Sequence, residues 1–419
     1  MNTALLAQSF SSAIRWNGIA HAITQLLFFL RTAILYATLS AQDFSLWAQS
    51  MSVMFLLLLW FDCGFRKSIP RYAPQLGIHN PLLYRIILFH ITIQLAGIPF
   101  FYVALIKLTD NTPVIAILCA LYLAEGLHAL MHTIYHAHFH ARSFNQIALT
   151  AALIEISLLI VLTLLAGESS QLLMGLLIIK LCTTTGATIQ TVRQLQYQPT
   201  VHTVQHSELK FTSFAVHSGA MWASTLLKSG TERNILIPVV TYYMGPEMAS
   251  ICKLANDGAV HIYRIVIKTI GSADTALLAH IEEGYTETSE KRTAIESALV
   301  KLTTQVTRLI LPLLGIIGIC MLVSYMMSYD QSVFHAFFIM AVGYLIETLW
   351  APYERLLEVK QEYRVLFLSY VPYVLLVSVL FLFLYISCIG LLPFLLFLQG
   401  VRLVTGLLLR TQVYRLFHI

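Results

Sequence analysis

The sequence predicts an all-α polytopic membrane protein of about twelve transmembrane helices, in two six-helix lobes that form a V-shaped bundle around a central cationic cavity. Of the 419 residues, 58% are hydrophobic and only 11% are charged, whereas ordinary soluble domains carry about 25% charged residues. The mean hydropathy is +0.74. Apolar runs recur along the whole chain, and a helix that crosses a bilayer needs about 20 predominantly apolar residues.

The apolar runs divide the chain into the following expected spans: 13–37, 44–62, 83–106, 114–136, 147–166, 171–192, 210–240, 247–278, 300–326, 333–355, 364–386 and 390–412. The seventh and eighth are the least regular, because Gly230, Pro238 and the Gly245–Pro246 turn interrupt them. We expect one or both of these two spans to be broken or tilted.

Lysines and arginines predict the orientation, because short cytoplasmic loops are rich in them. With the N-terminus inside, one side of the membrane carries Arg66, Lys67, Arg71, Arg85, Arg142, Arg193, Lys210, Lys291, Arg292, Lys301, Arg308, Arg355, Lys360, Arg364, Arg410 and Arg415. The opposite loops carry Lys107 beside several acids. Both termini are therefore expected in the cytoplasm. No external loop is long enough to carry the catalytic groups of a membrane glycosyltransferase or ligase, so we expect a transporter and no enzyme.

A polar segment at 193–210 divides the chain into an expected N-terminal lobe, 1–205, and a C-terminal lobe, 206–419. The segments 35–49 and 239–253 echo each other half a chain apart, since each runs from an apolar helix through a turn with an acid into a new helix. Six spans plus six in the same orientation is typical of parallel-repeat transporters, which bind their substrate between the halves.

Charged residues recur inside the expected spans, where each costs on the order of 3 kcal/mol on insertion scales and usually faces a cavity. The acids are Glu125, Glu155, Glu232, Asp257, Asp274 and Glu347; the more numerous cations are Arg15, Arg31, Lys180, Lys228, Arg233, Lys253, Arg264, Lys268 and Arg402. Some of these charges would pair with each other or reach the headgroups. Lys180, Lys228 and Arg402 are the cations that pairing explains least, because no acid lies within one helical turn of them on the same face.

The segment 253–268 places four charged residues on one helix face. At about 100° per residue, Lys253, Asp257, Arg264 and Lys268 fall within a wedge of roughly 60°. Lys253 and Lys268 would lie about 22 Å apart along the axis. A lipid-facing wedge of this kind would be intolerable, so it predicts a hydrated, positive cavity that attracts an anion; guanidinium groups suit bidentate contact with phosphate.

Three segments, 39–72, 141–160 and 242–268, resemble the polysaccharide-export branch of the multidrug/oligosaccharidyl-lipid/polysaccharide flippase superfamily. In that branch a small residue, an acid and an aromatic-Gly pair open the second helix, which ends in an acidic-Gly pattern before a basic segment. Here these places hold Asp43–Phe44, Asp62–Cys63–Gly64 and Arg66–Lys67, with Ser45 where a glycine is usual.

The resemblance implies a flippase that moves an undecaprenyl-pyrophosphate-linked oligosaccharide, such as an O-antigen unit, across a bacterial inner membrane by alternating access. Its partners would be this anionic lipid-linked glycan, membrane lipids and the glycan polymerase or ligase machinery, with no nucleic acid. The cations expected to contact pyrophosphate are Arg31, Lys228, Arg233, Lys253, Arg264 and Arg402, followed by Lys180 and Lys268.

The alternative function is a proton- or sodium-coupled multidrug exporter of the same superfamily, although that branch tends towards acidic cavity residues. Candidate ion-coupling acids are Asp257, Glu155, Glu347 and Glu125; Asp257 could equally serve only to neutralise Lys253. We expect no cofactor besides a coupling H⁺ or Na⁺.

A run of histidines, His128, His132, His136 and His140, recurs at four-residue spacing after Glu125. The spacing permits a metal site, but interfacial histidines near headgroups are favoured, so no metal is expected. The six scattered cysteines indicate neither a disulfide framework nor a metal site.

Overall fold

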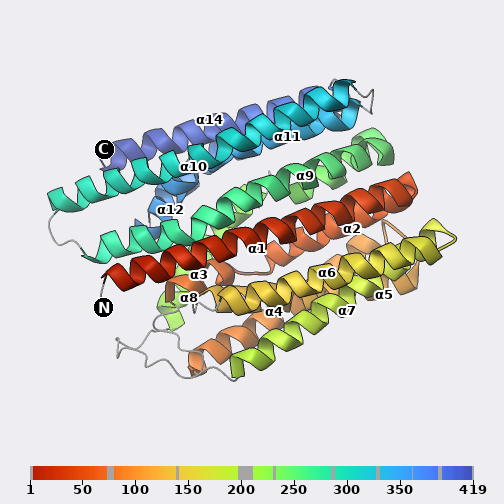
Figure 1. Ribbon diagram of the computed structural model, residues 1–419, viewed down its shortest axis with the longest axis horizontal. Coiled ribbons are helices and arrows are strands. Elements are labelled where there is room, and N and C mark those ends of the chain that lie inside the picture. The colour runs from red at the N-terminus through yellow and green to blue at the C-terminus, as the bar shows by residue number, and fades with distance from the viewer. Residues whose placement is uncertain are drawn as a thin grey trace. The chain divides into compact units, whose positions relative to one another are not determined.

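The computed structural model describes residues 3–72, 80–137, 141–196, 211–229, 233–284, 288–326, 331–360, 362–385 and 389–417. Within these ranges every regular element is an α-helix, which confirms the predicted all-α fold (Figure 1). The helices are α1 (Thr3–Thr38), α2 (Ala41–Trp60), α3 (Phe65–Tyr72), α4 (Pro81–Leu105), α5 (Thr112–Ala137), α6 (Ala141–Leu165), α7 (Ser169–Gln196), α8 (Phe211–Ser229), α9 (Arg233–Gly284), α10 (Thr288–Met326), α11 (Gln331–Thr348), α12 (Ala351–Lys360), α13 (Tyr363–Tyr385) and α14 (Leu391–Phe417).

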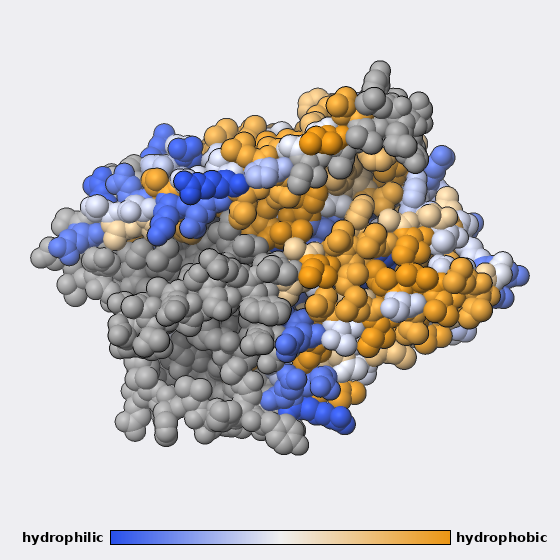
Figure 2. Space-filling view, in the orientation of Figure 1, coloured by the Kyte–Doolittle hydropathy of each residue, from blue (hydrophilic) through white to orange (hydrophobic). Residues whose placement is uncertain are grey.

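Ten of the described helices are long and apolar enough to cross a membrane. The pair α11 and α12, bent by 43° at its break, supplies an eleventh span if it is counted as one. Helix α8, in the predicted seventh span, is not among these ten. Large apolar side chains such as Leu164 and Val216 are exposed, and Figure 2 shows apolar side chains over much of the described surface on one face. The chain is a multi-pass membrane protein.

Local sequence signals explain where two of the spanning helices begin. Ser40 caps α2, since its side chain accepts a hydrogen bond from the backbone N–H of Asp43. Asn80 caps α4 in the same way through the N–H of Leu82, and Pro81 occupies the first turn. Proline is tolerated there because the first N–H groups of a helix have no intrahelical partner.

The helices form two compact units, one of residues 33–238 and one of residues 1–32 with 239–419. In the first, here called the inner-sequence unit, α5 packs on α3, α4 and α7, and α6 packs on α7 (Figure 1). Its core includes Phe65, Ile86, Leu130 and Phe214. In the second, the outer-sequence unit, α14 packs on α11, α12 and α13, and α10 packs on α11. The lobes expected from the sequence, 1–205 and 206–419, stay a prediction. Units defined by contacts do not test a division that is based on a sequence repeat.

Helix α9 covers the end of the expected span 210–240 and all of the expected span 247–278 in one element. It runs from Arg233 to Gly284 and contains Pro238, with its backbone break at Gly245. The φ of 88° and ψ of 173° at Gly245 lie in a region that is essentially restricted to glycine. The break therefore lies at the Gly-Pro turn, whereas Pro238, near the start of α9, is tolerated within the helix.

Candidate functional site

The charged wedge of α9 forms a polar cluster with α1 inside the outer-sequence unit. Lys253 and Asp257 make an ion pair of 2.9 Å, one turn apart. The second oxygen of Asp257 accepts a hydrogen bond of 3.0 Å from Thr32 Oγ1 on α1. Asp257 therefore does pair with Lys253, while its role in ion coupling stays a prediction. A carboxylate held by an ammonium group and a hydroxyl is stabilised in its ionised form.

A second layer of α9 lies one turn further along. The side chains of His261 and Gln25, both buried, make a contact of 2.7 Å between Nδ1 and Oε1. On α1, the Arg31 guanidinium lies 5.2 Å from the ring centre of Phe28, and this ring also lies 6.2 Å from that of His261. Arg264 is exposed. The environment therefore changes along the α9 wedge: Asp257 is paired with Lys253, whereas the guanidinium of Arg264 is exposed.

The wedge extends to α11 and α14 through Asn256. Tyr344 donates a hydrogen bond of 2.7 Å to Asn256 Oδ1, and the Arg402 guanidinium lies 4.3 Å from the centre of the Tyr344 ring. Arg402 also lies 3.5 Å from Glu347 Oε2. The pairing interpretation, which we expected to explain Arg402 poorly, is correct for it, because the acid comes from a neighbouring helix.

Lys180 requires the same correction in the inner-sequence unit. Its ammonium group lies 2.7 Å from Glu125 on α5, with side chains 10% and 14% exposed. Thr184 also donates to Glu125 at 3.1 Å, and Thr188 contacts His128 Nδ1 at 3.3 Å. Helical spacing along α7 could not reveal this partner, since α5 and α7 meet only through tertiary packing.

The remaining predicted site residues are placed as follows. Glu155 is buried in α6. The side chains of Lys228, Arg233 and Lys268 lie outside the described part of the structure, so their proposed contacts stay predictions.

Of the histidine run, His128 and His132 both lie against the ring of Phe144, at 5.4 and 4.4 Å between ring centres. His140 and the side chain of His136 lie outside the described residues. In the described part of the chain no group of three or more His, Cys, Asp or Glu could hold a metal ion.

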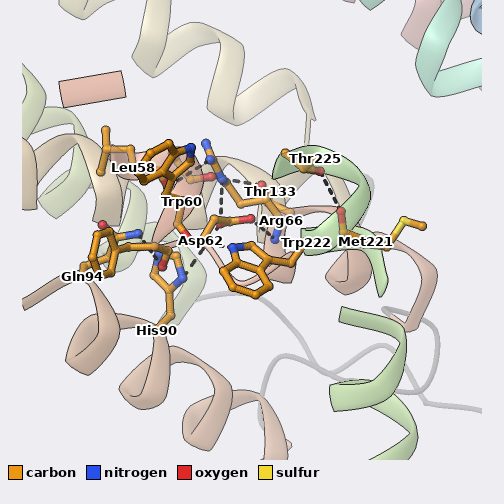
Figure 3. Close-up of polar contacts among 12 residues, drawn as sticks. Leu58, Trp60, Asp62, Arg66, His90, Gln94, Thr133, Met221, Trp222 and Thr225 are labelled. Carbon is orange, nitrogen blue, oxygen red and sulfur yellow. Dashed lines mark hydrogen bonds and ion pairs between the residues drawn. The ribbon is translucent and has the colours of Figure 1, made fainter. Parts of the chain in front are cut away.

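The sequence did not predict a further charged cluster as a site, although its residues Asp62 and Arg66, with Gly64 between them, carried part of the family resemblance. Asp62 is buried and binds Arg66 Nε at 2.7 Å, while the ring of His90 on α4 faces the same carboxylate (Figure 3). The signal in the sequence was the spacing of Asp62, Gly64 and Arg66, but nothing there pointed to His90.

Comparison with known proteins shows what fold this arrangement belongs to. No family model and no curated protein sequence matches the chain. Among solved structures, an outward-facing multidrug resistance MATE family transporter of the MOP superfamily matches with a TM-score of 0.66 and 11% identity, over 97% of this chain and 94% of that one. An inward-facing structure of such a transporter matches with a TM-score of 0.60 and 12% identity, over 96% and 99%.

A third similar structure is a MOP superfamily transporter from Pyrococcus furiosus, described as having a binding pocket of reverse polarity that suggests a different function. It matches with a TM-score of 0.63 and 14% identity, over 97% of this chain and 95% of that one. At these identities the similarity establishes the fold. The chain is a multi-pass membrane protein with the fold of the MATE transporters of the MOP superfamily.

Proposed function

We propose that this chain is a secondary transporter that works by alternating access, and that it exports drug-like molecules in exchange for a proton or sodium ion. The observation that carries the proposal is the similarity, over 96–97% of the chain, to both outward-facing and inward-facing structures of multidrug transporters. This similarity favours the exporter over the lipid-linked glycan flippase that the sequence resemblance implies.

The Asp257 cluster is the proposed coupling site. Asp257 of α9 accepts a hydrogen bond from Thr32 of α1 and pairs with Lys253 of its own helix, so a proton or sodium ion that competes for its carboxylate would loosen the contact between α1 and α9. Among the other candidate acids, Glu347 and Glu125 each have a cation within 3.5 Å on another helix. A bound ion would compete with a cation at all three acids, but only at Asp257 would it also displace a hydroxyl that joins α9 to α1.

The second candidate function is translocation of an undecaprenyl-pyrophosphate-linked glycan, and a specific observation favours it. The outer-sequence unit carries the cations Arg31, Lys253, Arg264 and Arg402 in its spanning helices, and two of them, Lys253 and Arg402, pair with Asp257 and Glu347. A surplus of cations suits a phosphate-bearing substrate. In this case the chain would act in a bacterial inner membrane, with both termini in the cytoplasm and polymerase or ligase machinery as its partners.

Transport in proteoliposomes would separate the two functions. We would measure efflux of the cationic dye ethidium and leaflet transfer of a fluorescent undecaprenyl-pyrophosphate glycan, under proton, sodium or no gradient. As an exporter, the protein should move ethidium with a gradient, Asp257→Asn should reduce the rate about tenfold or more, and Lys253→Ala should change it little. Lys301→Gln, which removes an exposed cation of α10, is the matched control.

The flippase gives the opposite pattern. Glycan transfer should then fall in both Lys253→Ala and Arg264→Ala, while ethidium is not moved. Transport of neither probe under any gradient would contradict both functions.

A further inference from the structure

The turn that joins α2 to α3 in the inner-sequence unit is tightly built. Cys63 and Gly64 both have positive φ, of 50° and 75°. A Cβ atom on Gly64 would lie 2.1 Å from the carbonyl oxygen of Ser218 on α8. The indole N–H of Trp222, also on α8, donates a hydrogen bond of 2.6 Å to the carbonyl oxygen of Trp60 at the end of α2 (Figure 3). The turn is therefore in direct contact with α8.

Asp62 holds the turn to α3. Its carboxylate accepts hydrogen bonds from Arg66 Nε at 2.7 Å and from the Arg66 backbone N–H at 3.3 Å. The side chain of Asp62 is only 7% exposed and that of Arg66 is 29% exposed. The pair therefore ties the first turn of α3 to the turn that follows α2, in a partly buried environment where an ion pair is screened less than at the surface.

His90 faces this pair from α4 without making a hydrogen bond of its own. Its side chain is only 2% exposed, and its Nδ1 atom lies 4.0 Å from Asp62 Oδ1. Neither ring nitrogen has a hydrogen-bond partner among the described residues. Buried polar groups in folded proteins are rarely left without a partner, and such exceptions call for an explanation. Two acceptors face the ring: the backbone of Gly126 on α5, and the carboxylate of Asp62, which already accepts from Arg66 (Figure 3).

We propose that His90 is a proton-binding site, and that its protonated ring takes Asp62 as a partner and weakens the hold of Asp62 on Arg66. The ligand is a single proton from solvent, which binds an imidazole nitrogen. Asp62 stays ionised, and the charge of the three side chains rises from zero to plus one. A shift of about 1 Å would bring the two atoms within hydrogen-bonding distance of each other.

The charges around His90 determine how its protonation is opposed or favoured. Burial of the ring opposes a charge on it most strongly, Asp62 favours the imidazolium, and Arg66 opposes it. From α5 the backbone of Gly126 faces the ring, and from α3 the Phe65 ring lies 5.9 Å away. Glu125, the residue before Gly126, is held by Lys180 on α7. Helix α8 carries another buried histidine, His217, next to Ser218, so the test has to distinguish His217 from His90.

The consequence would be a proton-dependent joint between α2, α3 and α8. With the ring neutral, Asp62 holds the first turn of α3 to the turn that follows α2. With the ring charged, the hold of Asp62 on Arg66 weakens and the turn can move against Trp222. This inference concerns the inner-sequence unit alone and does not depend on the substrate chosen under the proposed function.

The test is a pH titration of the whole chain labelled with 5-fluorotryptophan and followed by ¹⁹F NMR in detergent. The Trp222 resonance is assigned by its loss in Trp222→Phe. We expect it to move as the pH falls below about 6, because burial opposes the charged ring and places its protonation at the acid end of the range in which histidine changes its charge. The movement should be lost in His90→Gln and in Asp62→Asn, and it should be retained in the matched control His217→Gln.

Two results would overturn the inference: a Trp222 resonance that does not move in the wild-type chain, or a movement that survives in His90→Gln. If His90→Gln fails to fold, as judged by thermal unfolding at pH 8, the titration of Asp62→Asn replaces it as the test. A Trp222 resonance that still moves in Asp62→Asn would then overturn the inference. Because the readout needs no substrate, it stands whether or not the transport assay supports the exporter.

Discussion

At the residue scale, the charged side chains within the membrane-spanning helices are the groups that most require a partner. Lys253, Lys180 and Arg402 each lie within 4.0 Å of an acid. Only the first of these pairs joins residues one turn apart on the same helix. The other two join different helices, which is why counting acids along one helical face underestimated pairing.

The Lys180–Glu125 pair gives a prediction about stability. Lys180→Met should lower the free energy of unfolding by about 3 kcal/mol, because it leaves the carboxylate of Glu125 buried without its cation. The double variant Lys180→Met with Glu125→Gln should recover much of this loss, since no unpaired charge remains. Chemical unfolding in detergent measures all three; a double variant as unstable as the single one would contradict the argument.

At the scale of elements, two glycines set the backbone where helices end or break. Gly64, directly before α3, has a positive φ and lies against the backbone of α8, and Gly245 breaks α9 with a φ of 88°. Their surroundings differ, because nothing lies within 4 Å of a Cβ atom added to Gly245. Gly64 is thus restricted by both packing and backbone conformation, and Gly245 by backbone conformation alone.

We therefore expect Gly64→Ala to destabilise the chain by more than 2 kcal/mol, roughly, since strain of about 1–3 kcal/mol adds to a clash with Ser218. Gly219→Ala on α8 is the matched control. It lies in a helix with open space around it, so it should be neutral or stabilising by about 0.5–1 kcal/mol. Thermal unfolding of both variants measures the difference, and similar losses in the two would argue against the close approach.

For Gly245→Ala we expect a moderate loss of stability, about 1–3 kcal/mol, from backbone strain without a clash. If the break in α9 moves during alternating access, the transport rate should fall by more than the loss of folded protein explains. The initial transport rate per folded molecule checks this. A rate equal to that of the wild type would mean that the break serves folding only.

At the scale of the whole molecule, the asymmetry of lysine and arginine predicts the orientation. Both termini should be accessible only from the cytoplasmic side, because the basic loops resist translocation. Protease cleavage of tags at each end, in right-side-out and inverted vesicles, checks this; Lys107, expected outside, gives the control site for labelling after Lys107→Cys. Cleavage from the outer side at either terminus would contradict the prediction.

The sequence by itself determined the fold class and the membrane environment, and it indicated where charges lie along each helix. These follow from local properties: the composition, the length of apolar runs and the helical repeat. Even the irregular region was located correctly, since Gly245 and Pro246 lie where α9 breaks.

Only the tertiary structure decided which charges neutralise one another between helices. Glu125 meets Lys180, Glu347 meets Arg402, and His90 meets Asp62 across helices that are distant in the sequence. Such contacts depend on how the helices pack and on the rotation of each helix about its axis. The sequence period of one helix contains no information about its neighbour. This is also why the proton site proposed at His90 could not be found in the sequence, although Asp62 and Arg66 were visible in it.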